Sequence, residues 1–265
     1  MKKETEEKLA CSLSAETTEL LPFLAYMLQD FWELGSDPEV MYDLISKYVD
    51  LSPETRVLDL ACGKGAVSVK IAERLGVKVK GIDILPEFIE YAVQKAEEYN
   101  VAGLCEFAIG DINEAVKKEK GYDVVVFGAA GAIVLGTPAE MLEKLSDVIK
   151  PGGYILIDEG YLPDDAKQSD LKYYCYKLLT AKQWAALFEE AGLELVDTVF
   201  SENNNTPASG NSETGMAFIK ARANELIAMH PEKKSIFEGY VINQQNEYYD
   251  LENTLMSPTW ILRKK

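Results

Sequence analysis

The stretch Arg56-Val57-Leu58-Asp59-Leu60-Ala61-Cys62-Gly63-Lys64-Gly65 decides the fold of this chain. Its first half is an almost continuous apolar run, which is typical of a buried parallel strand. Its two glycines allow the backbone to turn tightly and to approach a ligand closely. The segment 66–75 that follows has its apolar residues at helical spacing. A strand, a glycine turn and a helix in this order predict a nucleotide site at the carboxyl edge of an open α/β sheet.

Alternating strand and helix patterns continue after this stretch. Further strands are expected at 77–83, 104–109, 123–127, 154–158 and 193–200, with helices between them. A final strand is expected at 258–263, close to the end of the sequence. The pattern predicts an α/β fold built on a doubly wound, mostly parallel seven-stranded sheet.

Residues 15–50 precede the first strand and stand outside this alternation. They carry two helical patterns, separated by the breaker Gly35-Ser36-Asp37-Pro38. They could form a packed flank or a lid over the glycine turn, and we assign them as a helical lid. Residues 1–14 are charged and are expected to be frayed.

Residues 201–257 interrupt the alternation a second time, before the final strand. A polar, asparagine-rich loop is expected at 201–215, and two helical segments follow it. We predict a helical insertion here. The chain is thus expected to form one domain over 1–265, with its core at 51–200 and 258–265.

Composition and charge narrow the range of partners. Against 27 basic residues stand 44 acidic ones, which gives a formal net charge of −17. Proteins that bind nucleic acids gain most of their affinity by neutralising phosphates. We therefore expect no nucleic-acid partner, and a small, neutral or cationic substrate is easier to accommodate.

The cysteines, the histidine and the apolar runs bear on location and metals. Four cysteines are scattered without C-x-x-C spacing, which predicts reduced thiols in a cytoplasmic protein. A single histidine offers no basis for a Cys/His zinc site, and no metal is expected. Residues 1–9 lack the apolar region of a signal peptide, and the longest near-apolar run, 127–136, is too short to span a bilayer. No membrane partner is expected, and the oligomeric state is not predicted.

Acidic residues end three successive predicted strands: Asp59, Asp83 and Asp111. In an open parallel sheet these ends face the same crevice. Asp83 can accept both hydroxyls of a ribose, and Asp111 can accept from an exocyclic adenine amine. The neighbouring Ile84 and Ile112 would hold the base between apolar faces. Each acid alone could simply cap the next helix, but together they favour a nucleoside site.

The glycine turn itself argues against a dinucleotide. A G-x-G-x-x-G motif would need a third glycine where Ser68 stands. Asp59, just before the turn, would also repel a pyrophosphate. A nucleoside without phosphates, carrying a cationic or zwitterionic tail, fits better.

With these features the sequence resembles the class I S-adenosylmethionine-dependent methyltransferases, over about 55–200 and the closing strand. The resemblance rests on several motifs in order: Val57 through Gly65, Gly81-Ile82-Asp83, Gly110-Asp111-Ile112, Tyr122-Asp123-Val124-Val125 and Lys150-Pro151-Gly152-Gly153. It implies S-adenosylmethionine as the cofactor, and a last strand that runs antiparallel between the fifth and sixth. The long segment before that strand departs from the family pattern, so the acceptor site has no template.

The resemblance also assigns cofactor contacts to individual residues. Asp83 would hold the ribose, and Asp111 with Ile112 the adenine. The methionine part would be held by Asp59, Ala61, Gly63 and Gly65. Gly110 and Gly128, at the ends of the third and fourth predicted strands, complete the predicted cofactor site together with Ile84.

The catalytic residues are less clear from the sequence. Glu159 and Tyr161 follow the fifth predicted strand, where a substrate-facing acid or hydroxyl would lie, although Glu159 could simply end the strand in solvent. No Asn-Pro-Pro-Tyr follows the fourth strand, which argues against the amino-methylating nucleic-acid branch. His230 is interpreted as a helix-end residue and Cys175 as a buried or idle thiol rather than a catalytic one.

We therefore predict methyl transfer from S-adenosylmethionine to a small-molecule acceptor. Two alternatives remain: a non-catalytic S-adenosylmethionine-binding sensor or partner subunit, and an NAD-linked oxidoreductase. Aromatic residues such as those of the lid and the insertion belong more often to a hydrophobic core than to an aromatic cage around a ligand. If they line the site, they suit an apolar or cationic acceptor; the residues concerned are Tyr26, Phe31, Trp32, Tyr240 and Tyr248.

Overall fold

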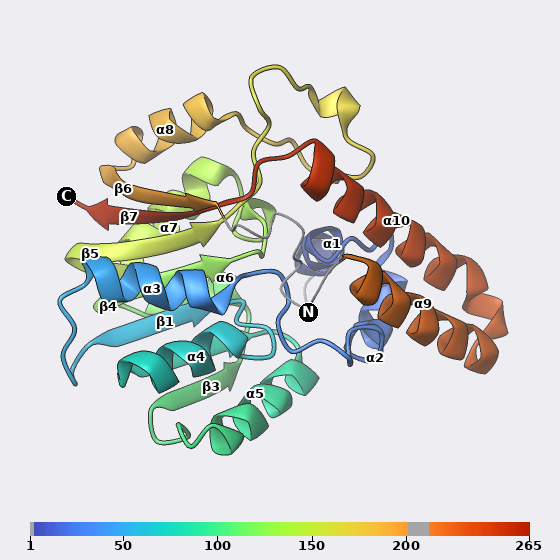
Figure 1. Cartoon of the computed structure of the whole chain (residues 1–265), viewed down its shortest axis with the longest axis horizontal. Helices are drawn as coiled ribbons and strands as arrows, with labels where there is room; N and C mark the ends of the chain where they lie inside the picture. The colour runs from blue at the N-terminus through green and yellow to red at the C-terminus, as the bar shows by residue number, and fades with distance from the viewer. Residues whose placement is uncertain (1–2, 201–211) are drawn as a thin grey trace.

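A seven-stranded sheet forms the centre of the protein in the computed structural model, which describes residues 3–200 and 212–265 (Figure 1). The strand order is β3-β2-β1-β4-β5-β7-β6. The strands are β1 Arg56–Leu60, β2 Lys78–Asp83, β3 Cys105–Ile109, β4 Tyr122–Gly128, β5 Ile149–Asp158, β6 Leu193–Phe200 and β7 Pro258–Lys264.

The strand directions confirm the predicted fold class. Strands β3, β2, β1, β4 and β5 pair in parallel, whereas β7 is antiparallel to both β5 and β6. The carboxyl ends of β1, β2 and β4 therefore lie side by side at one edge of the sheet, which is where such folds bind ligands.

Helices cover both faces of the sheet because adjacent strand residues point to opposite sides. Val57 packs in one buried cluster with α3 Pro38–Tyr48, α4 Ala66–Leu75 and α5 Pro86–Glu98. Its neighbour Leu58 packs in another with α6 Ile112–Lys118, α7 Pro138–Val148 and α8 Ala181–Glu190. The apolar run of β1 thus serves two cores, as a continuous hydrophobic strand in a parallel sheet should.

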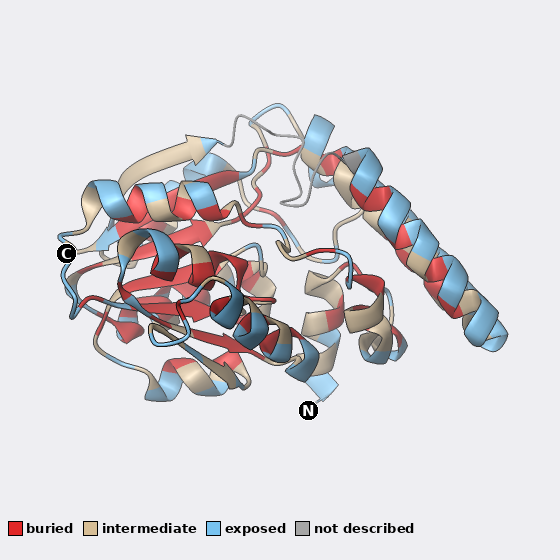
Figure 2. Cartoon of the chain, turned by 60° about the horizontal axis from the view of Figure 1, so that its bottom comes forward, coloured by how far each residue is buried: buried red, intermediate tan, exposed pale blue. Residues whose placement is uncertain are grey.

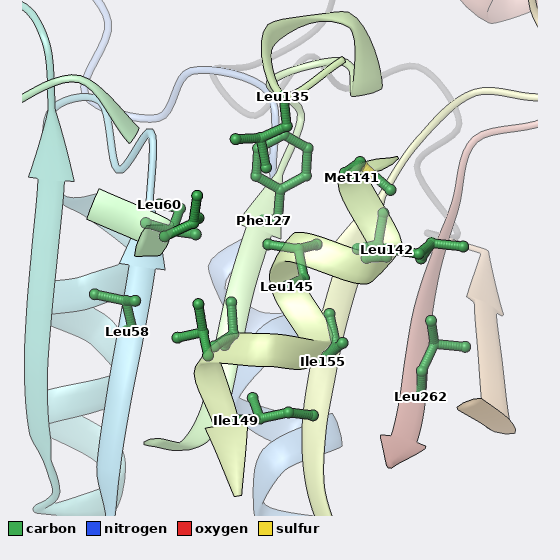
Figure 3. Packing of buried hydrophobic residues seen from close by; sticks show 14 of the residues in the cluster. Leu58, Leu60, Phe127, Leu135, Met141, Leu142, Leu145, Ile149, Ile155 and Leu262 are labelled. Carbon is green, nitrogen blue, oxygen red and sulfur yellow. The ribbon is translucent and has the colours of Figure 1, made fainter. Parts of the chain in front are cut away.

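The packing of α7 on the sheet shows how tightly the second core is filled (Figure 3). Met141, Leu142 and Leu145 of α7 are fully buried, and so are Leu58 and Ile155 below them. Truncating a fully buried leucine to alanine typically costs about 2–5 kcal/mol. This core fixes the sheet on which the ligand edge is built.

The segment before β1 differs from its predicted form. Lys3–Ser12 is a helix, α1, so the expected fraying of this part is wrong. Its charges are spaced for i,i+4 pairs, such as Lys8–Glu4 at 2.8 Å, and its Ala10 is buried. The continuous helix expected after residue 15 is also broken, into a 3₁₀ turn η1 Thr18–Phe23 and a short α2 Leu24–Met27, because Pro22 cannot donate an α-helical hydrogen bond.

The predicted insertion contains two long helices, α9 Ser212–Met229 and α10 Lys234–Asn253. They lie side by side and extend away from the sheet, with a buried stripe along the pair (Figures 1 and 2). One hydrophobic cluster joins them to α1, η1 and α2, and we call this assembly the cap. The loop expected at 201–215 falls mostly on 201–211, outside the described residues, and α9 begins where it was expected to continue.

A disulfide overturns part of the cysteine prediction. Cys11 of α1 is bonded to Cys175 of the segment after β5, with their Cα atoms 5.8 Å apart, whereas Cys62 and Cys105 are free thiols. The two bonded residues are 164 positions apart, so their spacing in the sequence held no sign of the pairing. The argument from reduced thiols to a cytoplasmic location fails for this pair.

Gly65→Ala is expected to destabilise the protein more than Gly76→Ala. Both glycines flank α4 with left-handed φ angles, 75° and 66°. This conformation costs a residue with a Cβ about 1–2 kcal/mol. A Cβ at Gly65 would also lie 2.7 Å from the Cβ of Ala92, whereas a Cβ at Gly76 meets nothing within 4 Å. The overlap adds about 1–3 kcal/mol, measurable by urea denaturation; equal losses in the two variants would contradict this account.

Candidate functional site

Two adjoining cavities lie at the carboxyl edge of the sheet. The smaller, about 100 Å³, is the edge cavity, between the strand ends and α1. The larger, about 290 Å³, is the cap cavity, between the end of β5, the segment 173–176 and α10. The two share the lining residues Ser12, Leu13, Leu34 and Ala129. Two ligands, or two parts of one ligand, could therefore meet where the cavities join.

The edge cavity brings together most of the predicted cofactor residues. Those that line it are Ala61, Gly63, Asp83, Ile84, Asp111, Ile112 and Gly128. Asp59, Gly65 and Gly110 do not line it. The apolar side chains and the two carboxylates that share this cavity match the demands of a nucleoside.

Asp83 is held rigidly at the end of β2. Its Oδ2 accepts the N–H of Gly63 at 2.9 Å, and its Oδ1 accepts the N–H of Leu85 at 3.0 Å. Burial raises the pKa of this carboxyl, and the two backbone donors oppose that rise. Since each carboxylate oxygen has a second lone pair, both can still accept hydroxyl protons from a ligand.

Asp111 has a structural and a cavity-facing role. Its Oδ1 accepts the N–H of Asn113 at 2.8 Å and caps α6, as the sequence allowed. Its Oδ2 lies 3.5 Å from the hydroxyl of Thr5, which is a weak contact from α1. The first helix, expected to be frayed, thus covers the edge cavity with Thr5, Lys8 and Leu9.

The three predicted residues outside the cavity act on the backbone or on α4. Asp59 is 3% exposed and accepts the hydroxyl proton of Ser68 at 2.6 Å. Gly65 donates its N–H to the carbonyl of Cys62 at 2.9 Å, which closes the turn. Gly110 donates its N–H to the carbonyl of Asp83 at 2.8 Å. These contacts shape the turn without lining the cavity.

Lys64, between the two glycines, is a residue that the sequence analysis missed. Its ammonium is buried and donates to the carbonyls of Leu28 and Phe31, both at 2.6 Å. Its own carbonyl accepts the indole N–H of Trp32 at 3.1 Å. Burial lowers its pKa to about 8. The residue joins the glycine turn to the cap, and only its place inside the turn could have drawn attention to it.

Glu159 lines the cap cavity, whereas Tyr161 lines neither cavity. The two oxygens of Glu159 accept the N–H of Ala132 at 2.7 Å and the hydroxyl proton of Tyr176 at 3.0 Å. Burial raises its pKa to about 7, and these donors oppose the rise. The ring of Tyr161 instead stacks on Trp260, with centroids 6.1 Å apart.

Aromatic and acidic side chains dominate the cap cavity. Of the five aromatic residues that the sequence offered either for the core or for a cage around the acceptor, Phe31, Tyr240 and Tyr248 line this cavity. Tyr26 and Trp32 do not. His230 directly follows α9, at the start of the link to α10, and lines neither cavity; its ring lies 5.2 Å from that of Phe23.

Within residues 3–200 and 212–265, no three or more His, Cys, Asp or Glu side chains gather as a possible metal site. No helix in those ranges combines the length and apolar character that crossing a membrane requires.

The wild type should lose stability relative to Asp59→Asn as pH rises from 5 to 7. Burial raises the pKa of Asp59 from 3.8 to about 7, so the folded protein holds a proton that the unfolded chain has released. The stabilisation is complete below about pH 4 and is lost as pH rises through about 7. The difference in unfolding free energy should shift by about 1–3 kcal/mol across this range. Urea denaturation at both pH values measures it, and parallel pH dependence of the two proteins would refute the assignment.

Lys64→Met should loosen the cap. It leaves the carbonyl of Phe31 without its buried donor, whereas the carbonyl of Leu28 keeps the N–H of Phe31 at 3.1 Å. An unsatisfied buried acceptor costs about 1–3 kcal/mol. Lys70→Met is the matched control on α4, because the partly exposed ammonium of Lys70 pairs with Glu73 at 3.0 Å and lies over the ring of Tyr99, instead of bonding the carbonyls that Lys64 reaches. Urea denaturation and limited proteolysis of α1 compare the stability of the two variants. A similar loss in both would show that Lys64 does not attach the cap to the glycine turn.

Comparisons with known proteins place this architecture in a family. Residues 51–192 match a family model described as a methyltransferase domain. The uncharacterized protein YjhP of Escherichia coli is 28% identical over 169 residues, which cover 62% of this chain and 67% of that protein. The putative methyltransferase YqeM of Bacillus subtilis is 34% identical over 122 residues, which cover 44% of this chain and 48% of that protein. The match thus spans only about half of the second relative.

Solved structures agree on the fold. A methyltransferase of Geobacter sulfurreducens, crystallised with S-adenosyl-L-homocysteine, superposes with a TM-score of 0.73 and 22% identity, over 92% of this chain and 98% of that one. Together with the family model, which covers more than half of the sequence, this confirms the resemblance seen in the motifs: the chain belongs to the methyltransferase domain family.

Proposed function

We propose that this protein transfers a methyl group from S-adenosylmethionine to a small-molecule acceptor. The observation that carries the proposal is the junction of the two cavities. The edge cavity suits the nucleoside of the cofactor, and the cap cavity offers separate space for an acceptor beside it.

The residues of the edge cavity fit the cofactor. Asp83 would accept from the ribose and Asp111 from the adenine, with Ile84 and Ile112 on either side of the base. Ala61, Gly63 and Gly128 leave room for close approach. When bound, S-adenosylmethionine supplies an electrophilic methyl group on a sulfonium, and a negatively charged protein accommodates that cation readily.

The chain's own contribution would be alignment and the exclusion of water. The cap covers the strand ends, and Lys64 fixes it to the turn that borders the cofactor site. Holding two reactants in a dry site is a sufficient source of rate for a displacement of this kind. Glu159 is retained as a candidate positioning residue because it orders both Ala132 and Tyr176; Tyr161 is not retained.

Incubation with methyl-labelled S-adenosylmethionine and a metabolite extract tests the function. We expect the label to appear in a small molecule, with formation of S-adenosylhomocysteine that depends on the extract. Cofactor binding without turnover in any extract would favour the sensor alternative. Tight binding of NAD with no response to S-adenosylmethionine, seen by calorimetry, would favour the oxidoreductase.

Asp83→Ala should weaken the binding of S-adenosylhomocysteine at least tenfold, which corresponds to about 1.4 kcal/mol. The variant loses the acceptor of the ribose hydroxyls. Asp123→Ala is the control, because Asp123 accepts the backbone N–H of Arg56 at 2.8 Å near the start of β4, at the opposite edge of the sheet. Calorimetry should find the control unchanged; an unaltered affinity in Asp83→Ala would remove this residue from the site.

A further inference from the structure

The cap cavity carries a strong charge bias. Six carboxylic acids line it, and no lysine, arginine or histidine does so among the described residues. The acids are Glu33, Asp37, Asp158, Glu159, Glu247 and Glu252. An anionic ligand, such as a carboxylate or a phosphate ester, would meet only repulsion there.

Three of these acids have at least one oxygen engaged by the fold. Asp37 caps α3 by accepting the N–H of Glu39 at 2.8 Å. Asp158 accepts the hydroxyl proton of Thr259, and Glu159 has a donor on each oxygen. These carboxylates hold the walls of the cavity together.

Glu247, on α10, shares the cavity with five tyrosines and keeps one oxygen without a donor from the described residues. Its two donors, the hydroxyl of Ser14 and the amide of Gln244, both bind Oε2, the amide at 2.9 Å. No described residue bonds its Oε1, and no described base pairs with it. Surrounding protein partly buries this residue and raises the pKa of its carboxyl. A partly buried acid with a free oxygen in a cavity is a ready acceptor for a ligand donor.

Aromatic rings share the cap cavity with this carboxylate. Phe31 and five tyrosines line the same cavity. For Tyr173, Tyr174, Tyr240 and Tyr248, burial raises the pKa first and the Glu247 charge next, which places all four hydroxyls within its field. The rings therefore stay neutral, and their faces favour a cation.

The rings are fixed in place by the fold. Asp250, fully buried on α10, accepts the N–H groups of Lys172 and Tyr173, each at 2.8 Å. This contact attaches the segment that carries Tyr173, Tyr174 and Tyr176 to the helix that carries Glu247. The carboxylate and the rings thus form one built site.

We propose that the methyl acceptor is an organic amine, bound in the cap cavity with Glu247 as its counter-ion among the tyrosine rings. The proposal rests on the function proposed above and names its substrate class. An amine enters as an ammonium and must release a proton, to Glu247 or to water, to free its lone pair. The nitrogen then forms the N–C bond as the C–S bond of the sulfonium breaks and the sulfur keeps the electron pair.

Three probes with one framework test the charge preference. Calorimetry on protein saturated with S-adenosylhomocysteine compares 2-phenylethylamine, 2-phenylethanol and 3-phenylpropanoate. We expect the amine to bind at least tenfold more tightly than the alcohol, and the carboxylate not to bind.

Glu247→Gln should weaken amine binding at least tenfold and leave the affinity for the alcohol unchanged. Glu238→Gln is the control, because Glu238 lies on the same helix and pairs only with Lys234, at 3.5 Å, on the surface. Melting curves with S-adenosylhomocysteine confirm that both variants fold.

The outcomes separate the two proposals. Equal binding of amine and alcohol, preference for the carboxylate, or no binding of any probe while S-adenosylhomocysteine still binds would each overturn the amine assignment alone. Loss of S-adenosylhomocysteine binding by the wild type would instead contradict the proposed function.

Discussion

The buried ammonium of Lys64 is the contact on which the site depends. A buried charge is tolerated only when hydrogen bonds replace its lost hydration. Here the carbonyls of Leu28 and Phe31, just after α2, provide that replacement, and the carbonyl of Leu28 accepts the N–H of Phe31 as well. Because Lys64 lies between Gly63 and Gly65, the cap is attached to the turn that borders the edge cavity. The position of the cap and the shape of the cofactor site are therefore coupled.

The acids at the strand ends have different roles, and the hydrogen-bond donors around each acid determine its role. The hydroxyl of Ser68 donates a hydrogen bond to the buried Asp59, which links this residue to α4. Two backbone N–H groups reach Asp83 and fix it at the cavity wall. One backbone N–H reaches Asp111 and leaves its second oxygen for the cavity side. Parallel strands bring such acids together, but local donors decide which of them can meet a ligand.

This division explains which parts of the site could be predicted from the sequence. The sheet and the residues Asp83, Ile84, Asp111 and Ile112 follow from short-range patterns, since a strand and the turn after it are contiguous. The structure places Asp59 outside the edge cavity, where Ser68 bonds it, and the sequence shows no sign of that bond. Tyr161 likewise lines neither cavity, because its ring packs on Trp260, which is far away in the sequence.

The cap was predicted less well for a related reason. The disulfide between Cys11 and Cys175 joins residues 164 positions apart, and the cap cavity draws its walls from the N-terminal segment, the segment after β5 and α10. None of these segments carries a recognisable motif alone. The charged segment that forms α1 was predicted to fray, because this helix is stabilised by packing on the other elements of the cap and the sequence does not show that packing.

The separation of core and cap has a consequence for specificity. The strand ends that suit the cofactor belong to the sheet, whose buried core leaves little freedom for change. Glu247 and the tyrosines belong to α10 and the segment 173–176, which lie outside those two cores and are held by the hydrophobic cluster of the cap and by polar contacts such as those of Ser14 and Asp250. Substitutions on α10 and in the segment 173–176, away from Lys64 and α1, can therefore alter the charge and shape offered to an acceptor without disturbing the nucleoside site. On this physical basis, a shared methyltransferase core is compatible with different acceptors, and the acceptor of this protein must be read from its cap.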